Sequence, residues 1–118
     1  MTRLYISGPV SGKPDDNRAA FADANMSLYE AGITAFDPHD LVIPSDSHET
    51  AMLLCVNELT GRTHKTGISY PVPRYDGVAL LPGWEQSEGA RIEVAVAEAC
   101  GIPCKTAEEW IEEATDER

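Results

Sequence analysis

One carboxylate lies on the face of its predicted helix that should be apolar. Helical periodicity runs over about residues 88–100, and the charged residues Arg91 and Glu98 mark the solvent side. Glu93 falls about 140–160° away from them, among alanine and valine side chains, and about a turn and a half from the helix start. Such a carboxylate either reaches a crevice above a neighbouring sheet, where it can do chemistry, or turns outward to solvent or to a nearby loop. Periodicity alone leaves both alternatives open.

The loop that precedes this helix has the features of an anion site. It runs from Pro82 to Gly89 and places Ser87 beside the free backbone amides of a helix N-terminus, where the helix dipole favours negative charge. Ser87 could also serve only as the helix N-cap, and the two roles are compatible. A second loop, from Gly8 to Pro14, contains two glycines. It matches neither a GxGxxG nor a Walker pattern, so by itself it is a weak phosphate-loop signal.

The elements that must position these residues alternate between strand and helix. Strands are expected at 3–7, 33–36, 76–82 and 102–105, and helices at about 18–31, 47–60, 88–100 and from 106 onward. We therefore expect an α/β fold: a single domain over residues 1–118 with an open parallel sheet and helices on both faces, Rossmann-like or flavodoxin-like. Ligands of such folds bind beyond the carboxyl ends of the strands. Residues 61–75 are expected to be irregular, a stretch long enough to act as a lid or a binding segment.

Composition excludes several classes of function. The chain has 118 residues, a formal net charge of −11 and 42% hydrophobic residues. No run approaches the ~18 apolar residues of a membrane span, and no apolar N-terminal run resembles a signal peptide, so we expect a cytoplasmic protein with no membrane partner. Nine scattered basic residues argue against binding to a nucleic-acid duplex. Three cysteines fit a reduced compartment, and they share no ligand spacing with the histidines, so neither a metal ion nor a cofactor is expected.

Two segments resemble a known family. Residues 5–12, Tyr5-Ile-Ser-Gly-Pro-Val-Ser-Gly12, resemble the opening of nucleoside 2-deoxyribosyltransferase-like proteins. Residues 76–93, Asp76-Gly-Val-Ala-Leu-Leu-Pro-Gly-Trp-Glu-Gln-Ser-Glu-Gly-Ala-Arg-Ile-Glu93, resemble their active-site strand, loop and helix. Within this superfamily the chain is most similar to the DUF4406 group, which is common in bacteriophages, and lies near the 2′-deoxynucleoside 5′-phosphate N-hydrolases. The resemblance covers the whole chain in element order and is motif-specific over residues 5–17 and 76–97.

The resemblance implies a reaction and a set of roles. Glu93 matches the family's catalytic Glu, which attacks C1′ of a deoxynucleoside and forms a covalent glycosyl-enzyme. Tyr5 matches a Tyr that orients this Glu. Ser87 matches a Ser that contacts the 5′-phosphate in the nucleotide N-hydrolases, where transferases of free nucleosides usually carry an Asp that would repel a phosphate. Further substrate contacts implied by the resemblance are Ser7, Gly8, Ser11, Gly12 and Gly89. We also expect Gly83 and Trp84 of the second loop to bind substrate, although Trp84 matches no family residue and could either stack on a base or pack its loop.

One position departs from the family. The relatives usually carry an Asp in the middle helix that assists proton transfer to the leaving base, and either Asn57 or Glu58 could take its place here, although Asn57 could not act as an acid. The sequence thus predicts cleavage of the N-glycosidic bond of a (deoxy)nucleoside 5′-monophosphate, by hydrolysis or by transfer to a base. A nucleotide-binding protein without turnover is the alternative. The resemblance also implies a small-molecule nucleotide as the partner and a homo-oligomer.

Overall fold

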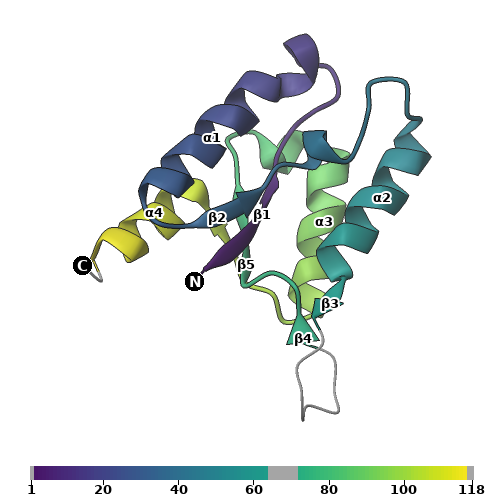
Figure 1. The fold of residues 1–118 in the computed structure, drawn as a ribbon. Helices are drawn as coiled ribbons and strands as arrows, with labels where there is room; N and C mark the ends of the chain where they lie inside the picture. The colour runs from purple at the N-terminus through teal and green to yellow at the C-terminus, as the bar shows by residue number, and fades with distance from the viewer. Residues whose placement is uncertain (1, 64–71, 117–118) are drawn as a thin grey trace.

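Four short strands form one parallel sheet, which confirms the predicted α/β class. The computed structural model describes residues 2–63 and 72–116 (Figure 1). The strands are β1 (Arg3–Ser7), β2 (Thr34–Phe36), β5 (Gly77–Leu80) and β6 (Cys104–Thr106), in the order β2-β1-β5-β6. Every pairing is parallel, and Tyr5 of β1 lies beside Phe36 of β2 and Val78 of β5. The chain leaves β1 toward β2 on one side and returns to β5 on the other, so the strand order reverses between β1 and β5.

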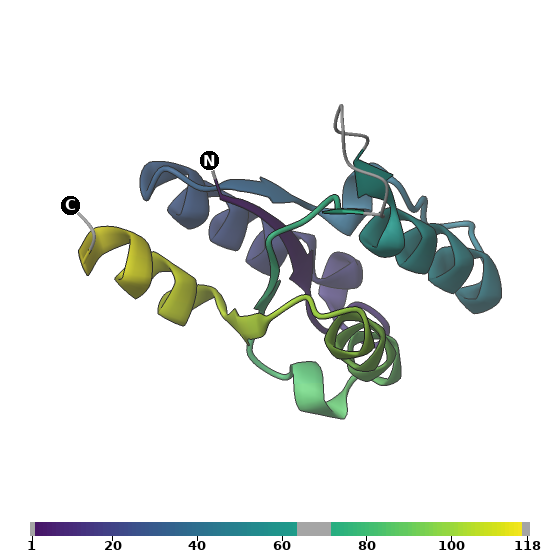
Figure 2. The same cartoon turned by 90° about the horizontal axis from the view of Figure 1, so that it is seen from below.

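Two pairs of helices cover the two faces of this sheet. Helices α1 (Arg18–Glu30) and α4 (Ala107–Asp116) pack together on one face, and α2 (His48–Thr60) and α3 (Glu88–Ala99) pack together on the other. Figures 1 and 2 show the α1–α4 pair and the α2–α3 pair on opposite sides of the strands. This doubly wound arrangement buries both faces of β5, as its unbroken apolar run predicted.

The period-2 alternation of β1 decides which side chains meet which helices. Leu4 and Ile6 belong to the buried cluster beneath α1 and α4, whereas Tyr5 belongs to the cluster beneath α2 and α3. Ser7 follows Tyr5 by two residues and therefore points to the same side. The hydroxyl groups of Tyr5 and Ser7 are thus both delivered to the α3 face of the sheet, toward its carboxyl edge.

Local capping signals place the helices where the sequence predicted them. The side chain of Ser47 caps α2 by accepting from the Thr50 amide at 3.1 Å. Thr106 and Glu109 form the predicted capping box at the start of α4, each accepting from the other's backbone amide at 3.1 and 3.0 Å. Because these bonds involve residues three apart, they depend on the local sequence alone.

One expectation about local structure was wrong. The stretch 61–75 is not irregular throughout, because β3 (Arg62–Thr63) and β4 (Val72–Pro73) pair antiparallel as a second, two-stranded sheet. Residues 64–71 lie outside the described residues. Asn17 occupies the N-cap position of α1, but its side chain makes no capping bond; it donates to the carbonyl of Pro9 at 2.8 Å instead.

Candidate active site

The carboxylate of Glu93 is buried and held by two hydroxyl groups. Glu93 is only 7% exposed and lies on the buried face of α3 with Ala90, Val94 and Ala97. The Tyr5 hydroxyl donates to Oε2, and the Ser7 hydroxyl donates to Oε1 at 2.9 Å. Of the two alternatives that periodicity left open, the structure selects the inward one.

These contacts govern the charge of the carboxylate. Burial raises the pKa of Glu93, because a low-dielectric surrounding disfavours the charged form, while the hydrogen bonds from Tyr5 and Ser7 act in the opposite direction. Burial, reinforced by the neighbouring Glu93, also raises the pKa of Tyr5 far above its usual range, so Tyr5 keeps its proton and remains a donor. The carboxylate therefore has its two oxygens fixed in direction while staying poorly solvated.

Tyr5 is itself held in place by aromatic neighbours. Its ring stacks on Phe36 with centroids 6.0 Å apart and meets the edge of Tyr75 at 5.7 Å. Cys55 of α2 belongs to the same buried cluster as Tyr5, and burial raises the pKa of its thiol. The position of the Tyr5 hydroxyl is thus set by packing from β2, from α2 and from the segment before β5.

Glu93 opens into a cavity of about 680 Å³ at the carboxyl edge of the sheet. This volume lies within the range typical of small-molecule sites, roughly 300–1,000 Å³. The cavity lies where the strand order reverses between β1 and β5, because the loops that leave these strands both contribute to its wall. From the predicted set, the residues that line it are Ser7, Gly8, Ser11, Gly83, Ser87, Gly89 and Glu93.

The cavity carries more basic groups than the acidic composition of the chain would suggest. Four lining residues are basic or can become so, namely Lys13, Arg18, His39 and His48, and three are acidic, namely Asp16, Glu88 and Glu93. The whole chain has 9 Lys and Arg and 3 His residues against 20 Asp and Glu, so its basic residues are concentrated here relative to its acidic ones. An anionic ligand can therefore be held without an extended basic surface.

Ser87 caps its helix and also lies at the cavity. Its hydroxyl caps α3 by accepting from the Ala90 amide at 3.2 Å, and the residue also lines the cavity. The loop after β1 also lines the cavity and packs closely on Leu81, because a Cβ at Gly8 would lie 2.8 Å from Cβ of Leu81. The position of this loop in the cavity wall therefore depends on a glycine at residue 8.

Five predicted residues lie outside the cavity lining. One of them, Tyr5, contacts Glu93, which does line the cavity. Gly12 does not line the cavity, and Trp84 is partly buried against the cluster beneath α2 and α3. Asn57 is exposed on α2. Glu58 accepts from Arg74 Nη1 at 2.5 Å and from the Tyr75 hydroxyl at 2.6 Å. Although burial opposes it, these bonds lower the pKa of Glu58, so Glu58 is a paired carboxylate that ties α2 to the segment before β5.

Sequence reasoning missed several residues of the cavity. Lys13 and Arg18 flank the turn η1 (Pro14–Asn17), and His39 belongs to η2 (Pro38–Asp40), which directly follows β2. A signal for His39 was present, because polar residues just after a parallel strand lie at the ligand-binding edge of the sheet. Cys55 and Met52 of α2 also line the cavity, and their apolar character gave no indication of it.

Other kinds of site are not seen in the described part of the chain. Within residues 2–63 and 72–116, no group of three or more His, Cys, Asp or Glu side chains is arranged to hold a metal ion. None of the helices described is long and apolar enough to cross a membrane. The three cysteines are free, with Cys55 buried and Cys100 exposed.

Comparison with known proteins gave one family match. No curated protein and no solved structure matches the chain. The family described as "Domain of unknown function (DUF4406)" matches residues 2–106, a range that includes all four strands of the parallel sheet and every residue of the cavity described above. The chain therefore belongs to the DUF4406 family.

Proposed function

We propose that the protein cleaves the N-glycosidic bond of a (deoxy)nucleoside 5′-monophosphate, with Glu93 as the nucleophile. The observation that carries this proposal is the buried Glu93 carboxylate at the cavity, with Tyr5 on one oxygen and Ser7 on the other. A carboxylate that only stabilised the fold would gain little from such a position, because burying a charge costs free energy unless it is fully compensated.

The chemistry follows from the geometry of the carboxylate. One carboxylate oxygen of Glu93 donates an electron pair to C1′ of the sugar while the bond from C1′ to the base nitrogen breaks. The base departs with the bonding electrons and takes up a proton. Water then attacks C1′ of the glycosyl ester, loses a proton and releases the carboxylate, which completes hydrolysis. Tyr5 keeps its proton throughout, so it can aim the carboxylate and stabilise its charge when the ester is released.

The other features of the cavity favour a phosphate-bearing ligand. Ser87 at the start of α3, together with the backbone of the loop after β1, offers neutral donors to an anion. Lys13 and Arg18 add positive charge at the same cavity. The similarity to nucleoside 2-deoxyribosyltransferase-like proteins and to nucleotide N-hydrolases supports this proposal through the match of Glu93 and Ser87. The bacteriophage association of the group is part of the same proposal.

One observation favours a nucleotide-binding protein without turnover as the second candidate. Asn57 and Glu58, the positions expected to assist the leaving base, lie outside the cavity lining, and Glu58 is paired with Arg74 and Tyr75. Without a group placed to protonate the base, the barrier to cleavage would be higher. A transferase that uses a second base as acceptor is distinguished from a hydrolase by adding a free base and looking for an exchanged nucleotide.

The test is release of free base from a panel of ribo- and deoxynucleoside 5′-monophosphates, followed by chromatography. Glu93→Gln should abolish release, because an amide cannot form the glycosyl ester, while keeping partners for Tyr5 and Ser7. Glu98→Gln is the matched control, since Glu98 is an exposed residue of the same helix, and it should release base like the unaltered protein. Binding of a nucleotide without release of base by the unaltered protein would refute the enzyme and support the binding protein. Release that persists in Glu93→Gln would refute Glu93 as the nucleophile.

Two further properties complete the proposal. The family resemblance implies a homo-oligomer, which light scattering coupled to gel filtration would test. It also implies action on a nucleotide pool in the cytoplasm, that of the host if the gene is carried by a phage. Neither property is needed for the chemistry at Glu93.

A further inference from the structure

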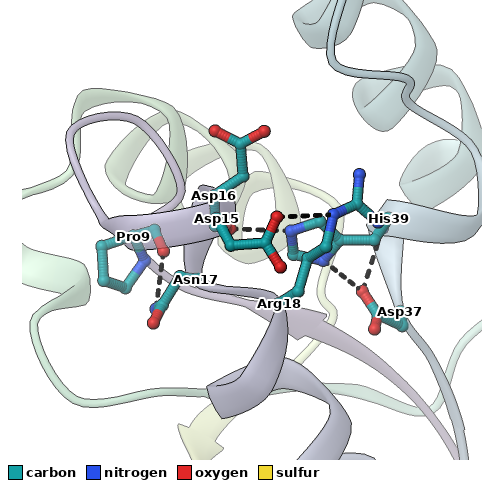
Figure 3. Close-up of polar contacts among 7 residues, drawn as sticks. All are labelled: Pro9, Asp15, Asp16, Asn17, Arg18, Asp37 and His39. Carbon is teal, nitrogen blue, oxygen red and sulfur yellow. Dashed lines mark hydrogen bonds and ion pairs between the residues drawn. The ribbon is translucent and has the colours of Figure 1, made fainter.

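The imidazole of His39 contacts hydrogen-bond acceptors through both of its ring nitrogens. Nδ1 lies 2.8 Å from Oδ1 of Asp37, and Nε2 lies 2.8 Å from the backbone carbonyl oxygen of Asp16 (Figure 3). The ring also meets the edge of Phe21 with centroids 4.7 Å apart. The ring is therefore held on three sides, with its side chain and that of Asp37 largely buried.

One form of the imidazole satisfies both contacts of His39 as hydrogen bonds. A carbonyl oxygen can only accept, so Nε2 must carry a hydrogen for the contact with Asp16 to be a hydrogen bond. The carboxylate of Asp37 also accepts, and its Oδ1 already receives the backbone amide of His39 at 2.9 Å. Both contacts are hydrogen bonds only when both ring nitrogens are protonated. A neutral ring would turn a lone pair toward one of the two oxygens.

The Asp16 carbonyl that His39 Nε2 contacts belongs to a strained backbone segment, residues 15–17. Asp15, Asp16 and Asn17 have φ of 50°, 53° and 61°, and they are the only non-glycine residues with positive φ in the described part of the chain. Residues with a Cβ adopt this left-handed conformation at a steric cost, although Asp and Asn tolerate it better than most. We call residues 15–17 the left-handed turn. Its conformation is held by His39 at Asp16 and by the bond from Asn17 to the Pro9 carbonyl.

The left-handed turn lies between the two cations of the cavity. Lys13 precedes it, Arg18 follows it, and both line the cavity together with Asp16 and His39 itself. Without the hydrogen bonds from His39 to Asp16 and from Asn17 to Pro9, the three strained residues would relax toward ordinary backbone conformations. The side chains of Lys13 and Arg18 would then change direction.

We propose that His39 is a positioning residue whose doubly protonated ring holds the left-handed turn in place, an interaction that we call the latch. The turn in turn keeps Lys13 and Arg18 directed at an anionic ligand. It does so only while His39 carries both protons. The effect on ligand binding rests on the proposed function, whereas the latch itself does not. The latch weakens as pH rises, because the carboxylate of Asp37 is the stronger acceptor and keeps the proton on Nδ1, so the proton lost is the one that Nε2 donates to the Asp16 carbonyl.

Other charged groups near the ring must be considered for such a pH dependence. The turn η2 contributes Asp37, which pairs with the ring directly. The turn η1 contributes Asp16, whose side chain lines the cavity, and Asp15, which forms an ion pair with Arg18 of α1 at 3.7 Å. Helix α2 contributes His48, which lines the cavity but is exposed. Of the histidines in the described residues, His39 is the one that contacts the left-handed turn.

The first experiment needs no ligand. Nuclear magnetic resonance of the histidine rings, recorded from about pH 5 to about pH 9, should show protons on both nitrogens of His39 at the acidic end. The backbone amides of residues 15–17 should shift with the same midpoint as the ring. His48→Gln removes the other cavity histidine and should leave this response intact. Amides of residues 15–17 that do not respond to the titration of His39, or a His39 ring with only one proton at low pH, would overturn the latch.

Two variants then connect the latch to the cavity. His39→Phe keeps a ring against Phe21 but has no donor, so the amides of residues 15–17 should lose their pH response. His39→Gln offers a neutral donor to Asp16, and it should restore an ordered turn that no longer responds to pH. If His39→Phe does not fold, His39→Gln still decides the question, because a pH response of the turn that survives in it would refute the role of the ring.

Binding of each common deoxynucleoside 5′-monophosphate is then measured by calorimetry in the Glu93→Gln background, where turnover is blocked. Affinity should fall by roughly tenfold across the titration of His39, the factor expected for one charge-assisted hydrogen bond. Both proteins carry His48→Gln as well, so that the other cavity histidine does not contribute. His39→Gln should then remove this fall and leave only the change due to ionisation of the phosphate, which has the opposite sign. An equal fall in both proteins would overturn the link to the cavity. Failure of every nucleotide to bind would count against the proposed function and leave the resonance result on the latch unaffected.

Discussion

Replacing Tyr5 by Phe removes one of the two donors of Glu93 and little else. The ring keeps its stacking on Phe36 and its edge contact with Tyr75, because neither contact involves the hydroxyl. The Glu93 carboxylate, 7% exposed, is left with the Ser7 hydroxyl on Oε1 and without its donor on Oε2. We therefore expect the consequences of Tyr5→Phe to report on the charge of Glu93 rather than on packing.

The size of the effect follows from the loss of one hydrogen bond to a buried charged group. Such bonds contribute about 1.5–3 kcal/mol, compared with about 1 kcal/mol between neutral groups. If the lost interaction is needed when the carboxylate is regenerated from the glycosyl ester, kcat should fall by roughly 10- to 100-fold, because this step follows departure of the base. The unfolding free energy at neutral pH should fall by an amount of the same order, less whatever the site recovers by admitting water.

The direction of the pKa change at Glu93 determines how Tyr5→Phe should alter the pH dependence of activity and of stability. Burial raises the pKa of Glu93, and the Tyr5 hydroxyl opposes that rise, so Tyr5→Phe should raise the pKa further. A nucleophile must be ionised, so the acidic limb of the activity profile should move to higher pH. A carboxyl group with a raised pKa in the folded state lowers stability as pH rises through that pKa. The stability deficit of Tyr5→Phe should therefore be small near pH 4 and larger at pH 7.

Base release as a function of pH and urea unfolding at acidic and neutral pH measure the two effects. Tyr75→Phe is the matched control, since it removes the same atom from a neighbouring ring whose hydroxyl bonds to Glu58 outside the cavity lining. It should reduce stability but leave the acidic limb where it is. The reasoning would be refuted by an unchanged limb in Tyr5→Phe, or by an equal movement of the limb in Tyr75→Phe.

Three further predictions concern the frame of the site and its charge. Gly77→Ala should destabilise the protein by about 1–3 kcal/mol in urea unfolding, because a Cβ at Gly77 would collide with the ring of Trp110; a variant as stable as the unaltered protein would contradict this packing. Thr106→Ala should cost about 1 kcal/mol in thermal unfolding, because it removes the acceptor of the Glu109 amide in the capping box of α4; an unchanged Tm would show that the box contributes nothing. Lys13→Gln should weaken nucleotide binding by roughly threefold and reduce the salt dependence of binding, as expected for one exposed charge. Calorimetry at two salt concentrations measures this, and an unchanged salt dependence would contradict the prediction.

The positions of the elements were predictable because their signals are local. The strand Arg3–Ser7 was predicted residue for residue, and α2 and α3 were predicted to within one residue at each end. Ser47 and Ser87 mark helix starts through bonds to amides three residues on, so no distant contact is required. The pairing of β3 with β4 was missed because two-residue strands carry no periodicity to detect.

The sequence by itself determined the parallel α/β class and placed Glu93 on the apolar face of its helix, since periods of 2 and 3.6 residues fix which side chains share a face. Only the tertiary structure showed that the Glu93 side chain turns inward. Only the tertiary structure decided that Tyr5 and Ser7, 88 and 86 residues away in the chain, both donate to that carboxylate. It also placed Asn57 and Glu58 outside the cavity lining and set His39 against the left-handed turn. Such contacts depend on strand order and on the direction of each side chain across the sheet, and a pattern within one element carries no information about either.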